Sequence, residues 1–135
     1  MTQPYTVEVL IVEDEATIRE LFVTTLEHYF PGIGIDVAVD GAEAIAKMSA
    51  GCRPELILTN LVMPNLDGEQ LLRWVRIERP GTPVVAVSAI RTNAAFDGYL
   101  GKPVELGELL ACIGRWLPEW QPSDLSQPTL GSTFG

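Results

Sequence analysis

Short apolar runs alternate with amphipathic segments along most of this chain, and this alternation constrains the fold more than any other feature. Runs of strand character occupy residues 7–12, 33–39, 55–60, 83–88 and 98–101. Apolar residues recur at helical spacing over residues 16–29, 41–48, 69–79 and 104–117. Strands that alternate with helices usually form parallel sheets with helices on both faces. The pattern therefore predicts an α/β protein, a doubly wound sandwich around a five-stranded parallel sheet.

Composition narrows the classes of protein that this chain can be. Its 135 residues suit one domain, and 47% are hydrophobic, which is enough for a core without disulfides. Acidic residues outnumber basic ones by 18 to 9, giving a net charge of −9. Such a surface repels phosphate backbones and anionic lipids, so we expect no nucleic-acid partner and no membrane partner.

The two cysteines and the two ends of the chain bear on location and domain limits. Cys52 and Cys112 follow no metal or redox spacing, and residues 1–6 carry no lysine or arginine. We therefore expect reduced thiols and a cytoplasmic protein. Proline, serine, glutamine and glycine dominate after Pro118, so a domain over residues 1–118 and a disordered tail or linker over residues 119–135 are predicted.

Polar side chains stand at the ends of the predicted strands. Glu13 and Asp14 follow the first strand, Asn60 ends the third, Ser88 ends the fourth, and Lys102 follows the fifth. The carboxyl ends of parallel strands share one edge of a sheet, where ligands bind. Two carboxylates there suit Mg²⁺, and a lysine can meet a phosphoryl oxygen or a carboxylate. The sequence thus predicts an acidic pocket with one lysine at this edge.

Four short motifs make a family resemblance specific. They are Ile11 to Glu15, Met63-Pro64 with Asp67-Gly68, Ser88-Ala89, and Tyr99 with Lys102-Pro103. In this order and spacing, residues 7–117 resemble the receiver domains of two-component response regulators. The resemblance implies a five-stranded sheet of flavodoxin-like topology. It also implies an aspartate that accepts a phosphoryl group from a histidine kinase beside a bound Mg²⁺.

The resemblance also implies roles for individual residues. The weakened or vestigial metal site comprises Glu13, Asp14, Asn60 and the carbonyl of Val62. The switch and phosphate-contact positions are Ser88, Tyr99 and Lys102. Asn60 stands where the family has its phosphoacceptor aspartate. No catalytic residue is expected, and the protein is not expected to be an enzyme.

Asn60 is the first departure from the family pattern. A carboxylate can attack phosphorus and form an acyl phosphate, whereas a neutral amide cannot usefully do so. Two acids and one lysine give the pocket a formal charge of −1, in place of −2 with an aspartate. We therefore expect Mg²⁺ to bind weakly at most.

The connection between the fourth and fifth strands is the second departure. Ile90 to Asp97 provide eight residues, whereas a parallel crossover usually needs about a dozen or more. Eight residues span about 28 Å when extended but only about 12 Å as a helix. A loop or a single turn is predicted, so the fourth helix of the family is short or missing.

Two explanations of Asn60 stay open. A naturally degenerate receiver, or pseudo-receiver, accounts for both departures, whereas a laboratory exchange of an acceptor aspartate accounts only for Asn60. Thr59 is a poor substitute acceptor because strand alternation points it away from the pocket. An unrelated hydrolase using the same acids lacks a nucleophile elbow in the sequence.

The expected function is that of a phosphorelay signalling module. We expect it to act by contacts with a protein partner, namely a histidine kinase, another regulator or an effector. The alternative is an ordinary Mg²⁺-dependent phosphoacceptor whose aspartate was exchanged. Purely structural roles are alternatives at two positions, since Ser88 could be a plain strand-end hydroxyl and Tyr99 a packing aromatic.

Overall fold

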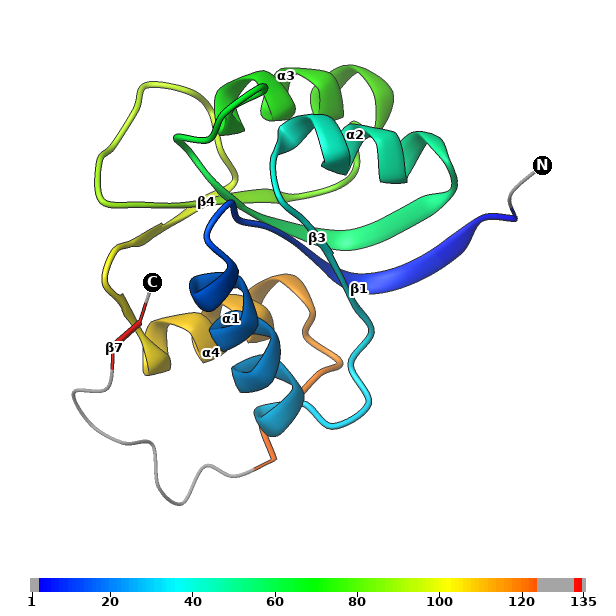
Figure 1. The fold of residues 1–135 in the computed structure, drawn as a ribbon. Coiled ribbons are helices and arrows are strands. Elements are labelled where there is room, and N and C mark those ends of the chain that lie inside the picture. The colour runs from blue at the N-terminus through cyan, green and yellow to red at the C-terminus, as the bar shows by residue number, and fades with distance from the viewer. Residues whose placement is uncertain (1–2, 124–132, 135) are drawn as a thin grey trace.

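A five-stranded parallel sheet forms the centre of the molecule in the order β2-β1-β3-β4-β5 (Figure 1). It is seen in a computed structural model that describes residues 3–123 and 133–134. Its strands are β1 (Tyr5–Val12), β2 (Ile35–Ala38), β3 (Cys52–Asn60), β4 (Val84–Ser88) and β5 (Gly98–Gly101). The helices are α1 (Ala16–Tyr29), α2 (Gly41–Ser49), α3 (Gly68–Glu78) and α4 (Leu106–Trp116). The predicted doubly wound sheet is confirmed.

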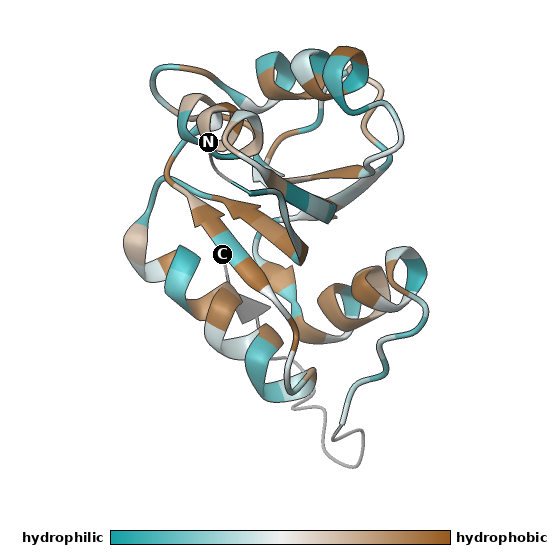
Figure 2. Ribbon diagram, turned by 90° about the vertical axis from the view of Figure 1, so that its right-hand side faces the viewer, coloured by the Kyte–Doolittle hydropathy of each residue, from teal (hydrophilic) through white to brown (hydrophobic). Residues whose placement is uncertain are grey.

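The helices form a layer on each face of the sheet. Helices α2 and α3 cover one face, and α1 and α4 cover the other (Figure 1). Alternate residues of each central strand enter the two cores, as β1 shows, with Val9 and Ile11 on the α1/α4 side and Leu10 and Val12 on the α2/α3 side. The strands are strongly hydrophobic, and the helices carry apolar and polar faces (Figure 2). Both faces are covered because parallel strands of this kind bury both sides.

The crossover from β4 to β5 contains no helix over residues 89–97, all of which are described. Ala94 and Phe96 from this loop pack against the core on the α2/α3 side. Asp97 anchors its end, accepting a hydrogen bond from the backbone N–H of Val84 at 2.7 Å and pairing with Arg76 at 2.9 Å. The prediction that the fourth helix is short or missing is confirmed, and a loop takes its place.

Strand β3 begins earlier than the apolar run of the sequence suggests. It starts at Cys52, so Pro54 lies inside it, opposite Val7 of β1. Proline in a central strand normally removes a ladder hydrogen bond. Here the pairing with β4 begins only at Ile57, so no strand of the described part of the chain lies beside Pro54 on that side. Because β4 starts beside Ile57, β3 can contain Pro54, a residue type that usually lies outside central strands.

The chain after α4 partly packs on the domain. Trp120 packs against the α1/α4 core, and its N–H donates to the carbonyl of Leu117 at 2.9 Å. Ser123 donates its N–H to the carbonyl of Tyr29 at 2.7 Å. A two-stranded antiparallel pair joins β6 (Val104–Glu105) to β7 (Thr133–Phe134). Most of the predicted tail, residues 124–132 and 135, lies outside the described residues.

One further boundary follows from the pairing of β6 with β7. Helix α4 begins at Leu106 and not at Val104, because Val104 and Glu105 pair with β7. Within the described residues, no helix is long and apolar enough to cross a membrane.

Candidate functional site

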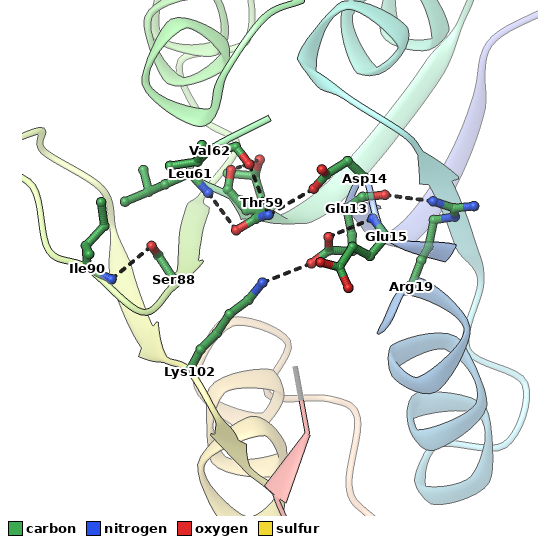
Figure 3. Close-up of polar contacts among 11 residues, drawn as sticks. Glu13, Asp14, Glu15, Arg19, Thr59, Leu61, Val62, Ser88, Ile90 and Lys102 are labelled. Carbon is green, nitrogen blue, oxygen red and sulfur yellow. Dashed lines mark hydrogen bonds and ion pairs between the residues drawn. The ribbon is translucent and has the colours of Figure 1, made fainter. Parts of the chain in front are cut away.

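The predicted pocket residues meet at the carboxyl edge of the sheet (Figure 3). Glu13 and Asp14 follow β1, Asn60 ends β3, and Lys102 follows β5. Gly68, at the start of α3, lets the turn after β3 fold back. A Cβ on Gly68 would lie 2.4 Å from the carbonyl oxygen of Asn60. The backbone therefore brings the α3 turn directly against the site.

Asn60 is the centre of one hydrogen-bonded group. Its amide nitrogen donates to Asp14 Oδ1 at 3.1 Å and to the carbonyl oxygen of Val62 at 3.3 Å. Its amide oxygen accepts from the N–H of Leu61 at 3.1 Å. This orientation of the carboxamide pairs donors with acceptors at all three contacts, and the flipped orientation would oppose like groups. Asn60 thus links the end of β1 to the turn after β3.

Glu13 is the centre of a second group. The side chain is almost fully buried, with Oε1 3.2 Å from Lys102 Nζ and Oε2 accepting from the N–H of Glu15 at 3.0 Å. Burial raises the pKa of the Glu13 carboxyl, and the Glu15 N–H and the Lys102 ammonium offset only part of this effect. Glu13 and Lys102 therefore form a partly buried ion pair beside Asn60.

The predicted switch residues are joined to each other through one backbone unit. Ser88 Oγ accepts a hydrogen bond from the backbone N–H of Ile90 at 3.2 Å. The hydroxyl of Tyr99 donates to the backbone carbonyl of Ile90. The Tyr99 ring also contacts Arg91, whose guanidinium carbon lies 4.7 Å from the ring centroid. Among the described residues, the Asn60 carboxamide forms no hydrogen bond with either Ser88 or Tyr99.

Thr59 lies on the other side of β3 from Asn60, as alternation predicts. It is completely buried, and its hydroxyl donates to the carbonyl of Asn60 at 2.9 Å. A buried and hydrogen-bonded hydroxyl is poorly placed to receive a group from solvent.

Sequence reasoning missed two arginines at this edge. Arg19, in the first turns of α1, donates to the backbone carbonyl of Glu13 at 2.8 Å, and Arg91 packs on Tyr99. The position of Arg19, four residues after Glu15 in the first turns of a predicted helix, was a weak signal that it faces the strand end. Nothing in the sequence indicated the contact of Arg91.

The donor set does not fit a resident Mg²⁺ ion. The family's metal site uses acid oxygens and a carbonyl, yet Asp14 Oδ1 and the Val62 carbonyl here both face the N–H groups of Asn60. Both oxygens of Glu13 are engaged by Lys102 and Glu15. The described residues contain no cluster of three histidine, cysteine or acidic side chains that could hold a metal ion. The predicted metal positions come together, but around an amide.

Comparisons with known proteins give a consistent family. A sequence model described as "Response regulator receiver domain" matches residues 9–114. "Response regulator MprA" of Mycobacterium bovis is 32% identical over 129 residues, covering 90% of this chain and 55% of its own length. This chain thus spans about half the length of the curated relatives that it matches.

Solved structures agree with the sequence matches. The signal receiver domain of a signal transduction histidine kinase from Syntrophus aciditrophicus has a TM-score of 0.74 at 28% identity, covering 84% of this chain and 91% of that one. The receiver domain of sensor histidine kinase PA1611 from Pseudomonas aeruginosa, which holds a magnesium ion in its active site cleft, has a TM-score of 0.71 at 26% identity. The match to PA1611 covers 83% of this chain and 98% of that one.

Proposed function

Because this chain belongs to the family of response regulator receiver domains, we propose that it is a receiver-like signalling module that is not phosphorylated at position 60. It acts by contacts with a protein partner, which is a histidine kinase, another regulator or an effector. The observation that carries the proposal is Asn60, which occupies the acceptor's place with its carboxamide hydrogen-bonded on both sides.

The chemistry of position 60 supports this proposal. Attack on phosphorus needs a nucleophilic oxygen, and the amide oxygen of Asn60 is a weak one that already accepts from Leu61. The lysine that would meet an incoming phosphoryl oxygen is paired with Glu13. The reactive group of the family is therefore replaced by an unreactive one.

The switch residues support a module without a phosphorylation cycle. Phosphorylation would bring a charge of about −1.5 to −2 into the pocket, and a neutral amide brings none. A ligand shifts a conformational equilibrium only through contacts that differ between the two states. Without a phosphoryl oxygen, Ser88 keeps its bond to Ile90, and regulation must come from the partner.

A chemical phosphorylation assay tests the proposal. The chain is incubated with Mg²⁺ and a small phosphodonor such as acetyl phosphate, and its intact mass is then measured. We expect no labile phosphoryl adduct on the chain as given and an adduct on Asn60→Asp. An adduct on the unaltered chain would end the proposal, and mapping would then identify the residue that accepts the group.

A second candidate function has one observation in its favour. Glu13, Asp14 and Lys102 all remain around position 60, as in an ordinary phosphoacceptor whose aspartate was exchanged for asparagine. The genomic codon for position 60 decides between the two. An aspartate codon would make this chain an inactivated receiver of a normal phosphorelay.

The remaining expectations belong to the same proposal. The module is non-enzymatic and cytoplasmic; the two free cysteines, Cys52 and Cys112, suit a reducing compartment. Its net charge of −9 argues against nucleic acid and anionic lipid as direct partners. We place the domain at residues 1–118 and a tail or linker from residue 119 onward, of which Trp120 and Ser123 still contact the domain.

A further inference from the structure

We infer that the Asn60 carboxamide takes over the structural role of the family's divalent cation, so that the parts of the pocket are linked without a metal. This inference rests on the proposed function and extends it to the ligand preference of the pocket. Asn60 then has two effects: it removes the phosphoryl-accepting carboxylate, and it disfavours the binding of Mg²⁺.

The amide nitrogen of Asn60 points at the oxygens that a cation would bind. It lies 3.1 Å from Asp14 Oδ1 and 3.3 Å from the Val62 carbonyl oxygen. An amide NH₂ has two N–H donors, so both oxygens are satisfied by one group. The partially positive hydrogens stand where positive charge is needed, and they are held there covalently.

The third anchor of the carboxamide prevents it from turning away. Asn60 Oδ1 accepts from the backbone N–H of Leu61 at 3.1 Å, which determines the direction of the NH₂ group. Binding of Mg²⁺ would require the loss of two N–H···O bonds at Asp14 and Val62. Mg²⁺ also demands near-ideal octahedral oxygen geometry, which a fixed NH₂ group in the site prevents.

The remaining acid of the pocket is equally committed. Glu13 is almost fully buried and gives one oxygen to Lys102 and the other to the N–H of Glu15. Of the two acids predicted as metal ligands, only Asp14 is exposed. Lys102 and the NH₂ group of Asn60 together replace the positive charge of a metal ion.

This arrangement connects separate parts of the chain. Asp14 follows β1, whereas Asn60 and Val62 belong to the end of β3 and the turn that leads to α3. In the family, a cation held by the same positions would make this connection. Here the NH₂ group is covalently part of Asn60 in β3 and is hydrogen-bonded to Asp14 after β1. This connection therefore persists when divalent cations are removed.

Thermal unfolding in a chelator and in millimolar Mg²⁺ tests the inference. We expect the unaltered chain to unfold at the same temperature in both, because a ligand that does not bind the folded state cannot stabilise it. Calorimetric titration of the unaltered chain with Mg²⁺ or Mn²⁺ should show no saturable heat. This measurement needs no variant, so it stands even if a variant fails to fold.

Two exchanges at position 60 separate the linking role from the charge. Asn60→Asp loses both N–H donors and places a third carboxylate beside Asp14. Its unfolding temperature in chelator should fall by roughly 3–8 °C and recover with Mg²⁺. Asn60→Ala loses the same donors without adding a ligand, so it should fall in chelator and stay low in Mg²⁺.

Asn65→Asp is the matched control. Asn65 also donates its amide to a carboxylate, Asp40 Oδ2 at 2.7 Å, so the exchange breaks the same kind of bond. It likewise creates two neighbouring acids but lies outside the group formed by Asp14, Asn60 and Val62. We expect a lower unfolding temperature that Mg²⁺ restores much less than in Asn60→Asp.

Two results would overturn the inference. One is an unaltered chain that unfolds at a higher temperature in Mg²⁺ than in chelator, and the other is an Asn60→Ala variant as stable as the unaltered chain. These failures differ from failure of the proposed function. A phosphoryl adduct on the unaltered chain would refute the proposed function, whereas Mg²⁺ binding without an adduct would refute the inference alone.

Discussion

The Lys102 side chain forms an ion pair with Glu13 that contributes to the stability of the fold. Its ammonium lies 3.2 Å from Glu13 Oε1, and the Glu13 side chain is only 3% exposed. Removing one member of such a pair leaves an uncompensated buried charge. We predict that Lys102→Met lowers the free energy of unfolding at pH 7 by about 1–3 kcal/mol, measured by urea denaturation.

The pH dependence of this variant identifies the cause. Burial raises the pKa of Glu13 in the folded protein above its unfolded value, so the acid destabilises the fold as the pH rises through the folded pKa. Without Lys102 this effect is larger. The decrease in the free energy of unfolding caused by Lys102→Met should therefore become smaller as the pH is lowered and Glu13 takes up a proton.

Lys47→Met is a matched control for the lysine prediction. Lys47 pairs with Asp36 at 2.9 Å, but that carboxylate is 20% exposed and water can compensate it. We expect a smaller loss than in Lys102→Met. An equal or larger loss in Lys47→Met would show that burial of Glu13 does not determine the effect.

At the scale of elements, the contact between α3 and the end of β3 positions the site. Asp67 and Gln70 form a capping box that begins α3. Gly68 is the first residue of this helix, and its N–H donates to the carbonyl of Leu61 at 2.8 Å. The helix start is therefore bonded to the residue that follows Asn60.

Gly68→Ala should disturb this junction. The added Cβ would lie 2.4 Å from the Asn60 carbonyl oxygen and 3.0 Å from the Leu61 Cα, and both are backbone atoms that must shift. We predict a loss of about 1–3 kcal/mol in the free energy of unfolding, measured by chemical denaturation. The amide resonances of Asn60 and Leu61 should move at the same time.

Gly114→Ala provides the comparison within another helix. Gly114 lies inside α4, and a Cβ there meets nothing within 4 Å. Alanine is the better helix former, so this exchange should stabilise the protein by about 0.5–1 kcal/mol. If Gly68→Ala were as harmless, the close approach of α3 to β3 would be irrelevant to stability.

At the scale of the whole molecule, the segment after α4 belongs physically to the domain up to Ser123. Trp120 packs against the α1/α4 core, and Ser123 bonds to the end of α1. A chain that ends at Pro118 should be less stable than one that ends at Ser123 by about 1–2 kcal/mol, because the Trp120 burial is lost. Thermal or urea unfolding of the two chains measures the difference.

The comparison also tests the predicted domain limit at residue 118. Equal stability of the two shortened chains would support residues 1–118 as the complete domain. The chain ending at Ser123 lacks the pairing of β7 with β6, which covers two residues in each strand and should contribute little. Its stability should therefore stay close to that of the full chain.

Much of the architecture could be read from the sequence because its signals are local. Helix α1 and strand β5 have the predicted bounds, since proline, glycine and period changes mark their ends. The missing fourth helix followed from the length of one connection. The start of β3 did not, because Pro54 is tolerated only through the staggered start of β4, a relation between distant segments.

The residue types alone establish that position 60 carries an amide among two acids and a lysine at one edge of the sheet, and hence that its chemistry differs from an acceptor's. The direction of that amide depends on the tertiary structure. Hydrogen bonds form only where distant segments meet at about 3 Å, and no local pattern encodes the meeting of Asn60 with Asp14 or of Lys102 with Glu13. Those contacts turn the predicted acid pocket into a group of hydrogen bonds centred on an amide.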